Sequence, residues 1–317
     1  LILVEDLVSE KNLLHPVQEA MVKYHGSQCG FCTPGFIMSL FSMFKNYSKL
    51  KDEVIKDSIA GNLCRCTGYK PIIKAAKSLN NKNKIDSFYK NKKKTISLLK
   101  KIGNESITIY KKDKRYFAPR YVSELKKILK KNINSQLLSG GTDLSLLVTK
   151  ERKDINSTIY MNSIKELNYI KKSKGYIEVG ATTPLSDFEI YIKKYYPDFN
   201  KILKRYGSIQ IRNVATVAGN IATASPIGDN LPLLLALDSK IVLQGIKKSK
   251  IIPINNFFIG YRKTKLKAGQ FIHSIRIPVV DKNIFKAYKI SKRFDDDISS
   301  VCAAFNLTIE NKKIKNI

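Results

Sequence analysis

"HGSQCGFCTPG", residues 25–35, and "GNLCRCTGYKP", residues 61–71, are two copies of one pattern. In each copy a glycine stands three positions before the first cysteine, and the second cysteine is followed by threonine. The first copy holds Cys29 and Cys32, and the second holds Cys64 and Cys66. Paired cysteines in a chain without a secretory signal are more often metal ligands than disulfides, so the two copies suggest the halves of one metal site.

Each copy is flanked by helical patterns. In residues 15–25 apolar side chains recur at helical spacing, Pro16 suits the first helical position, and Gly26 can end the helix in a left-handed conformation. Similar patterns cover residues 34–47, 49–61 and 69–79, and Gly61 is expected to end the third helix. The simplest arrangement is a four-helix bundle with both cysteine loops at one end.

Four thiolates suit either tetrahedral zinc or an iron–sulfur cluster. Zinc sites usually pair two CxxC loops, whereas this chain pairs one CxxC with one CxC. A two-iron cluster, in which each iron takes two thiolates, fits unequal pairs better. The spacing favours iron–sulfur and leaves zinc open.

Composition excludes several other classes of function. The formal charge is +31, but only nine of the 57 basic residues are Arg, and the lysines are scattered, so we do not predict nucleic-acid binding. No apolar run is long enough to cross a bilayer, and no signal peptide is recognised, so we expect a cytoplasmic protein without a membrane segment. "LILVEDL" reads as the middle of a strand and "FNLTIENKKIKNI" as part of a hairpin, so the chain looks cut at both ends.

The remainder of the chain divides into a linker and a mixed region. Residues 81–103 are charged, rich in Asn and without hydrophobic periodicity, which is typical of an interdomain linker. Beyond them helical and strand patterns alternate, and residues 240–254 read as a hairpin, so the fold class is multidomain, α followed by α+β.

Two glycine-containing segments precede helical patterns. They are Gly140–Asp143, and Gly219 and Asn220 together with residues 225–229. Such segments let backbone N–H groups approach a phosphate, and a dinucleotide needs donors from more than one side. Each segment taken alone is better interpreted as a tight turn, but a pair of them some eighty positions apart suggests a dinucleotide site.

The cysteine pattern, within "LHPVQEAMVKYHGSQCGFCTPG" and on to residue 79, resembles the helical [2Fe–2S] domain of the molybdenum hydroxylases. This resemblance implies that Cys29, Cys32, Cys64 and Cys66 are cluster ligands. It implies that Gln28 contacts the pterin of a molybdenum cofactor. In this family a ferredoxin-type domain comes first, and residues 1–8 look like its last strand.

Residues 116–278 are similar to the flavin-binding domain of the same family, an α+β domain of the PCMH type with two subdomains. The resemblance implies that FAD is held by two runs and four single residues: Leu137, Leu138, Ser139, Gly140, Gly141, Thr142, Asp143 and Leu144; Thr216, Val217, Ala218, Gly219 and Asn220; and Tyr206, Asp229, Ile272 and Lys289. It places Tyr261 and the acidic residues 291–300 beside the flavin, where NAD⁺ would bind.

The expected domains are a helical [2Fe–2S] domain over 1–80, a linker over 81–103, an FAD domain over 104–280, and the start of a flavoprotein C-terminal domain over 281–317. This order favours the xanthine dehydrogenase type, and the family implies a relay. Electrons would pass from a molybdenum cofactor on a large partner subunit, which converts hypoxanthine or xanthine to urate, through the [2Fe–2S] cluster and FAD to NAD⁺. No residue of this chain is predicted to be catalytic. The alternatives are an aldehyde or other N-heterocycle dehydrogenase, and a zinc-stapled nucleotide-binding module without a redox role.

Overall fold

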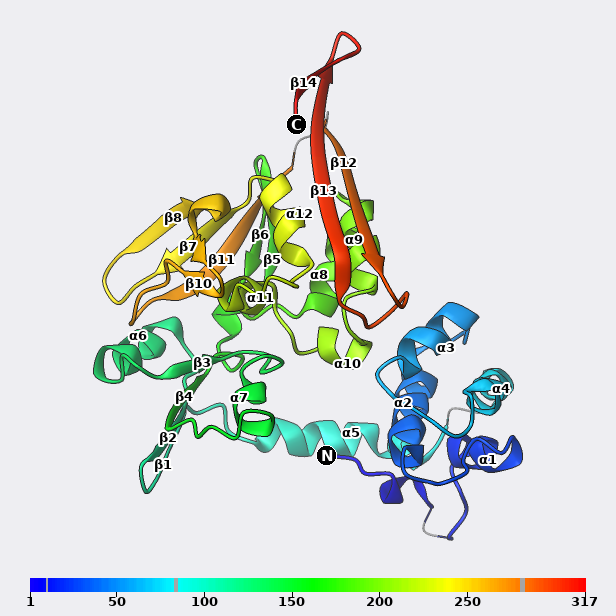
Figure 1. Ribbon diagram of the computed structural model, residues 1–317. Coiled ribbons are helices and arrows are strands. Elements are labelled where there is room, and N and C mark those ends of the chain that lie inside the picture. Colours follow the sequence, from blue (N-terminus) through cyan, green and yellow to red (C-terminus); the bar gives the residue numbers. More distant parts are fainter. Residues whose placement is uncertain (10, 83–84, 280–282) are drawn as a thin grey trace. The chain divides into compact units, whose positions relative to one another are not determined.

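The computed structural model describes residues 1–9, 11–82, 85–279 and 283–317. The chain forms two compact units, Leu1–Gly103 and Asn104–Ile317 (Figure 1). The first unit is helical and the second combines helices with four sheets. No helix within the described ranges is long and apolar enough to cross a membrane.

Four helices of the first unit share one apolar core, as the periodicity predicts. Phe36, Leu40 and Phe44 of the second helix are fully buried there, with Ile55 of the third and Ile72 of the fourth. The four helices are α1 (Pro16–Lys23), α2 (Thr33–Asn46), α3 (Asp52–Ile59) and α4 (Lys70–Ser78), and a short 3₁₀ helix, η2 (Leu79–Asn81), follows. The two cysteine loops join α1 to α2 and α3 to α4.

The end of α1 differs from the prediction in one residue. His25, with φ of 53°, is the left-handed residue, and Gly26 is not. The N–H of Gly26 donates to the carbonyl of Met21 (2.8 Å) and that of His25 to the carbonyl of Val22 (3.1 Å), the two bonds of a Schellman motif. Gly26 packs closely on Met21: a Cβ there would lie 2.7 Å from the Met21 sulfur, so this flexible side chain would have to shift.

The predicted linker contains a helix, α5 (Ser87–Lys101), which belongs to the first unit. Its first turn is capped by Asp86, whose side chain accepts from the N–H of Tyr89 (2.8 Å). Asp86 also accepts from Lys45 (2.8 Å) and from His15 Nε2 (3.2 Å), which joins the start of α5 to α1 and α2. No side chain of α5 is buried, so the segment lacks the apolar stripe by which helices are recognised in a sequence.

The first residues are not a strand. Glu5–Leu7 form a 3₁₀ helix, η1, and the N–H of Leu3 donates to the carboxylate of Asp6 (2.8 Å). A strand needs a partner for its backbone groups, and no described strand pairs with residues 1–9. Local bonds therefore replace the predicted extended conformation.

The second unit begins with a four-stranded sheet in the order β1-β2-β4-β3. Its strands are β1 (Ile107–Lys111), β2 (Lys114–Ala118), β3 (Gln136–Leu138) and β4 (Ser157–Tyr160); β1 is antiparallel to β2, while β2 and β3 are parallel to β4. Helix α6 (Val122–Lys131) buries Leu125 and Leu129 against Phe117 and Ile159 of this sheet. The helix α7 (Ser145–Thr149) and the 3₁₀ helix η3 (Lys165–Leu167) complete this part.

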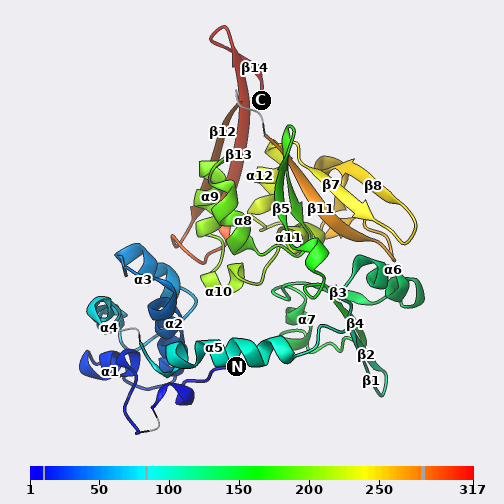
Figure 2. The same cartoon turned by 180° about the vertical axis from the view of Figure 1, so that it is seen from behind.

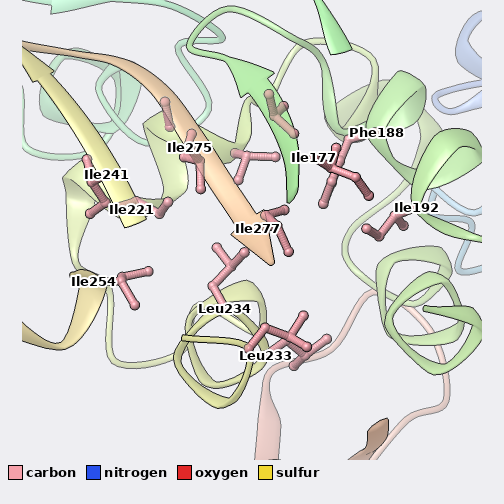
Figure 3. Packing of buried hydrophobic residues seen from close by; sticks show 14 of the residues in the cluster. Ile177, Phe188, Ile192, Ile221, Leu233, Leu234, Ile241, Ile254, Ile275 and Ile277 are labelled. Carbon is pink, nitrogen blue, oxygen red and sulfur yellow. The ribbon is translucent and has the colours of Figure 1, made fainter. Parts of the chain in front are cut away.

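A five-stranded antiparallel sheet, β5-β6-β11-β7-β8, carries the larger core. Ile177 and Ile275 of the sheet pack with Phe188, Ile221 and Leu234 of the helices (Figure 3). The strands are β5 (Ile170–Ser173), β6 (Tyr176–Gly180), β7 (Lys240–Gln244), β8 (Ser249–Pro253) and β11 (Phe271–Pro278); the helices are α8 (Leu185–Ile192), α9 (Pro197–Lys204), α10 (Ile209–Arg212), α11 (Val217–Thr223) and α12 (Asn230–Ala236). The predicted hairpin over 240–254 is confirmed as β7 and β8.

Two smaller sheets complete the second unit. A short pair, β9 (Phe258–Gly260) and β10 (Lys263–Thr264), follows the 3₁₀ helix η4 (Ile254–Asn256). The last sheet is β12 (Asn283–Ser291), β13 (Ser299–Glu310) and β14 (Lys313–Asn316), with β12 against α9 and β13 against α12 (Figure 2). The final residues thus form the predicted hairpin.

Candidate cofactor sites

The cysteine loops of the first unit bring their sulfur atoms together. Cys66 Sγ lies 3.7 Å from Cys64 Sγ of its own loop and 3.7 Å from Cys29 Sγ of the other loop. Sulfur–metal bonds of about 2.3 Å in a tetrahedral site imply sulfur–sulfur separations of about 3.8 Å. These two separations therefore suit thiolates from both loops that share one metal centre.

The local backbone explains how the loops reach this geometry. Gly30 and Gly68 have φ of 82° and 65°, conformations that glycine adopts without steric cost. Tyr69, with φ of 67°, continues the second turn, and its hydroxyl accepts from the N–H of Cys64 (3.0 Å). Cys32 is the residue that precedes the first turn of α2, so its sulfur lies at a helix N-terminus.

Hydrogen bonds prepare Cys64 to act as a thiolate. The hydroxyl of Thr67 (3.0 Å) and its backbone N–H (3.4 Å) both interact with Cys64 Sγ, and they lower the pKa of the Cys64 thiol to about 6. Burial raises the pKa of Cys32 instead. Metal ligation requires the deprotonated form, so Cys64 is more ready to bind a metal than Cys32.

The second unit contains a cavity of about 780 Å³, within the range that holds cofactors. It collects most of the residues that the family resemblance assigns to FAD. Those that line it are Leu137, Ser139, Gly140, Gly141, Thr142, Asp143, Leu144, Tyr206, Thr216, Ala218, Gly219, Asn220, Asp229, Ile272 and Lys289.

The two glycine-containing segments meet in this cavity. A Cβ on Gly140 would lie 2.1 Å from the carbonyl oxygen of Val214, so this turn packs directly on the backbone that leads into α11. Gly141 has φ of 72° and forms the turn itself. Gly219 is not in a loop, as the sequence suggested, but in the first turn of α11, where its N–H donates to the capping hydroxyl of Thr216 (3.0 Å).

Other polar side chains that line the cavity are held by specific bonds. The Tyr206 hydroxyl accepts from Asn220 Nδ2 (3.0 Å), and burial raises the pKa of Tyr206 to about 12. Lys289 pairs with Asp229 (2.5 Å), and both side chains are almost fully buried. Burial likewise raises the pKa of Cys302 to about 12, which keeps this fifth thiol protonated, as expected of an inert cysteine.

Four of the assigned residues do not line the cavity. Leu138 lies in β3, and the Val217 side chain is fully buried in the larger core. Tyr261, in the turn between β9 and β10, is 77% exposed, although its neighbour Arg262 reaches Asp143 at the cavity wall (2.9 Å). Gln28 belongs to the first unit and is exposed on the cysteine loop.

Several lining residues were not singled out from the sequence. They lie in turns that follow strands or helices: Ala181 and Thr182 after β6, Gly207 after α9, and Lys267–Gln270 before β11. No charged pattern or glycine pair marks the first of these turns. Asp296, Asp297 and Ile298 of the acidic segment also line the cavity, which places that segment beside the assigned FAD residues.

Comparison with known proteins identifies the family to which this chain belongs. Three family models match: the FAD binding domain in molybdopterin dehydrogenase over residues 110–280, the [2Fe-2S] binding domain over 3–77, and the CO dehydrogenase flavoprotein C-terminal domain over 286–317. The chain belongs to the molybdopterin dehydrogenase family. Its [2Fe–2S] and FAD-binding domains correspond to the cysteine loops and the cavity, so the reading as a zinc-stapled module is set aside.

Individual relatives agree with this family. A xanthine dehydrogenase of Emericella nidulans is 30% identical over 98% of this chain, and a nicotinate hydroxylase of the same organism is 28% identical over 93%. Carbon monoxide dehydrogenase from Hydrogenophaga pseudoflava has the same fold over 66% of this chain and 73% of its own, with a TM-score of 0.61 and 24% identity. The chain spans only 27% of the length of the xanthine dehydrogenase it matches.

Proposed function

We propose that this chain is the electron-relay part of a xanthine dehydrogenase-type enzyme. In this role a [2Fe–2S] cluster and FAD carry electrons from a molybdenum cofactor on a large partner subunit to NAD⁺. The observation that carries the proposal is the similarity to xanthine dehydrogenases over 98% of the chain, which includes both the cysteine loops and the cavity. The cofactors supply the redox chemistry, and the chain positions them.

The cysteine loops have a defined part in this proposal. Cys29, Cys32, Cys64 and Cys66 hold the cluster, and the Thr67 donors beside Cys64 stabilise negative charge on its sulfur. Cys29 and Cys66 are exposed, so a partner surface can approach the ligands closely. Gln28, on the same exposed loop, is proposed to contact the pterin of the molybdenum cofactor.

In this proposal the cavity of the second unit binds FAD. Both the turn at Gly140 and Gly141 and the first turn of α11 line the cavity, and we propose that their backbone N–H groups bind the pyrophosphate. Tyr206 and the Lys289–Asp229 pair add a hydroxyl, an ammonium group and a carboxylate to the same cavity. Tyr261 and the acidic residues 295–297 are proposed to border the site where NAD⁺ meets the flavin.

A dehydrogenase acting on another N-heterocycle or on an aldehyde is the second candidate. The nicotinate hydroxylase similarity, over 93% of this chain, is the observation that favours it. Both candidates give this chain the same relay role. The partner subunit would decide between them, because the substrate would bind at its molybdenum centre.

The experiment that tests the proposal uses the chain loaded with iron, sulfide and FAD. We expect this chain alone to oxidise NADH with an artificial electron acceptor, and not to hydroxylate xanthine. Purine turnover by the chain alone would contradict the relay role. FAD-loaded protein that does not oxidise NADH would contradict the NAD⁺ site. Assays of the complex with its molybdenum subunit against purines, nicotinate and aldehydes then identify the substrate.

A further inference from the structure

The segment Ser291–Ile298, here named the cover loop, joins β12 to β13 and forms part of the cavity wall. Asp296, Asp297 and Ile298 line the cavity, yet Phe294 and Ile298 are 72% and 58% exposed. A wall with so little burial depends on specific bonds to stay in place.

Arg205, which directly follows α9, donates three hydrogen bonds to this region. Its Nη1 donates to the carbonyl of Lys289 (2.8 Å), its Nη2 to Ser291 Oγ (3.0 Å), and its Nε to the carbonyl of Phe294 (2.8 Å). The guanidinium also lies over the Phe294 ring, 4.3 Å from its centroid. One side chain therefore reaches the end of β12, the start of the cover loop and its middle.

Further bonds shape the cover loop from within and join its far end to the cavity. Asp297 accepts from the backbone N–H of Arg293 (2.9 Å) and of Ile298 (3.0 Å), which shapes the loop without attaching it to the body. Beyond the loop, Ser299 bonds to Asp229. Arg205 thus attaches the end of the loop that follows β12, while Asp229, which lines the cavity, attaches the end that leads into β13.

The position of Arg205 couples the cover loop to the cavity. The next residue, Tyr206, lines the cavity, and the carbonyl of Arg205 accepts from Lys289 Nζ (3.3 Å), the cation that pairs with Asp229. Only a planar guanidinium presents three donors in such a fixed fork, so lysine at this position could not make the same set of bonds.

We propose that Arg205 is a positioning residue that holds the cover loop against the cavity and thereby slows the exchange of bound FAD. The second part of this proposal rests on the proposed FAD site. The first part, the attachment of the loop, can be measured without any cofactor. The two parts therefore need separate measurements.

Limited digestion with trypsin measures the attachment, because Lys292 and Arg293 offer cleavage sites inside the cover loop. In Arg205→Met we expect cleavage at these two sites, followed by mass spectrometry, to be at least about tenfold faster than in the parent. Arg205→Lys keeps the charge and should not restore protection. Lys204→Met removes a charge from the adjacent exposed position and serves as the matched control, with an unchanged cleavage rate.

FAD release is measured on the same proteins by flavin fluorescence after dilution. We expect release to be about tenfold faster in Arg205→Met and unchanged in Lys204→Met. Equal cleavage of the cover loop in Arg205→Met and the parent overturns the inference, whatever FAD does. Failure of the parent itself to bind FAD contradicts the proposed function instead, and the cleavage comparison still decides the role of Arg205.

A second variant keeps the test decisive if Arg205→Met does not fold. Phe294→Leu changes only an exposed ring that contacts the guanidinium, and it leaves the backbone carbonyl in place. We expect cleavage at residues 292 and 293 to rise by about threefold, since one of several contacts is lost. Unchanged cleavage in this folded variant overturns the contribution of the Phe294 contact, and hydrogen exchange of residues 292–298 provides an independent readout.

Discussion

At the scale of single residues, two features of the structure favour glycine at position 140. It sits in a turn that lines the cavity, and the absence of a Cβ lets the backbone of Val214 approach. The family resemblance explains this glycine by the approach of a pyrophosphate. The structure adds a second reason, because the backbone of Val214 occupies the space that a Cβ on Gly140 would need.

We predict that Gly140→Ala abolishes FAD binding. The added methyl group would lie 2.1 Å from the Val214 carbonyl oxygen and must push the two segments apart. Gly175→Ala is the control: this glycine has φ of 79° in the β5–β6 turn, but nothing lies within 4 Å of its Cβ position. The control should lose about 1 kcal/mol of stability and keep its FAD.

Fluorescence titration with FAD checks both variants. Retention of FAD by Gly140→Ala would show that the two segments tolerate separation. Loss of FAD by Gly175→Ala would show that general destabilisation is sufficient to empty the site. Either result would contradict the prediction that FAD binding depends on the close contact between Gly140 and Val214.

At the scale of elements, α5 is a helix that the sequence pattern did not predict, and its first turn is anchored to the helices before it. Asp86 caps this helix and accepts bonds from Lys45 and His15, and Phe88 packs edge-on against Phe41 with ring centroids 5.2 Å apart. Prediction by apolar periodicity requires a buried stripe, and α5 has none. The capping aspartate and the basic last turn, Lys100 and Lys101, are the signals that could have found it.

We predict that Asp86→Ala destabilises the attachment of α5 by about 1–2 kcal/mol, because it removes a helix cap and a charged hydrogen-bond partner of Lys45. Hydrogen exchange of residues 87–95 measures the effect. Asp52→Ala is the comparison, since its pair with Lys77 is exposed and should contribute little. Similar exchange in both variants would contradict the anchoring role of Asp86.

The same anchor should depend on pH. Burial lowers the pKa of His15, so the neutral ring is favoured in the folded state and its contribution is lost as pH falls through about 6.5. Burial opposes ionisation of Asp86, but the bonds from Lys45, Tyr89 and His15 outweigh it and lower its pKa. The contribution of Asp86 is therefore present above about pH 4 and lost below it. Hydrogen exchange of α5, corrected for intrinsic rates, should report both steps.

Other elements were predictable because their signals are local. Helices α1, α2, α3 and α4 each combine an apolar stripe with a proline or a polar residue at the start, and the hairpin β7–β8 has short apolar runs. Contacts between residues distant in sequence could not be predicted in this way. The cavity could be expected from two glycine segments, but that Val214 packs on Gly140 and that Arg205 reaches the cover loop cannot be derived from local spacing.

At the scale of the whole molecule, the chain has two units with separate hydrophobic cores. The cysteine loops belong entirely to the first unit and the cavity entirely to the second. Loss of one cofactor should therefore leave the structure of the other site intact. The proposed electron transfer, in contrast, needs both cofactors.

We predict that Cys64→Ala loses the [2Fe–2S] cluster and destabilises the helical unit, because the cluster joins its two helix pairs. FAD binding should be unchanged. Cys302→Ala is the control, since this thiol lies in the second unit and should affect neither iron nor sulfide content. Iron and sulfide analysis with the visible spectrum checks both variants, and full cluster content in Cys64→Ala would refute the ligand assignment.

The contact between Gly140 and Val214 also has a consequence for how the protein folds. These positions are far apart in the chain, and strands β4, β5 and β6 lie between them in sequence. Closing so long a loop is slow, so this pocket is expected to complete late on the folding pathway. FAD, which would bind only the finished pocket, stabilises the native state by mass action and acts as a probe for the last long-range step of folding.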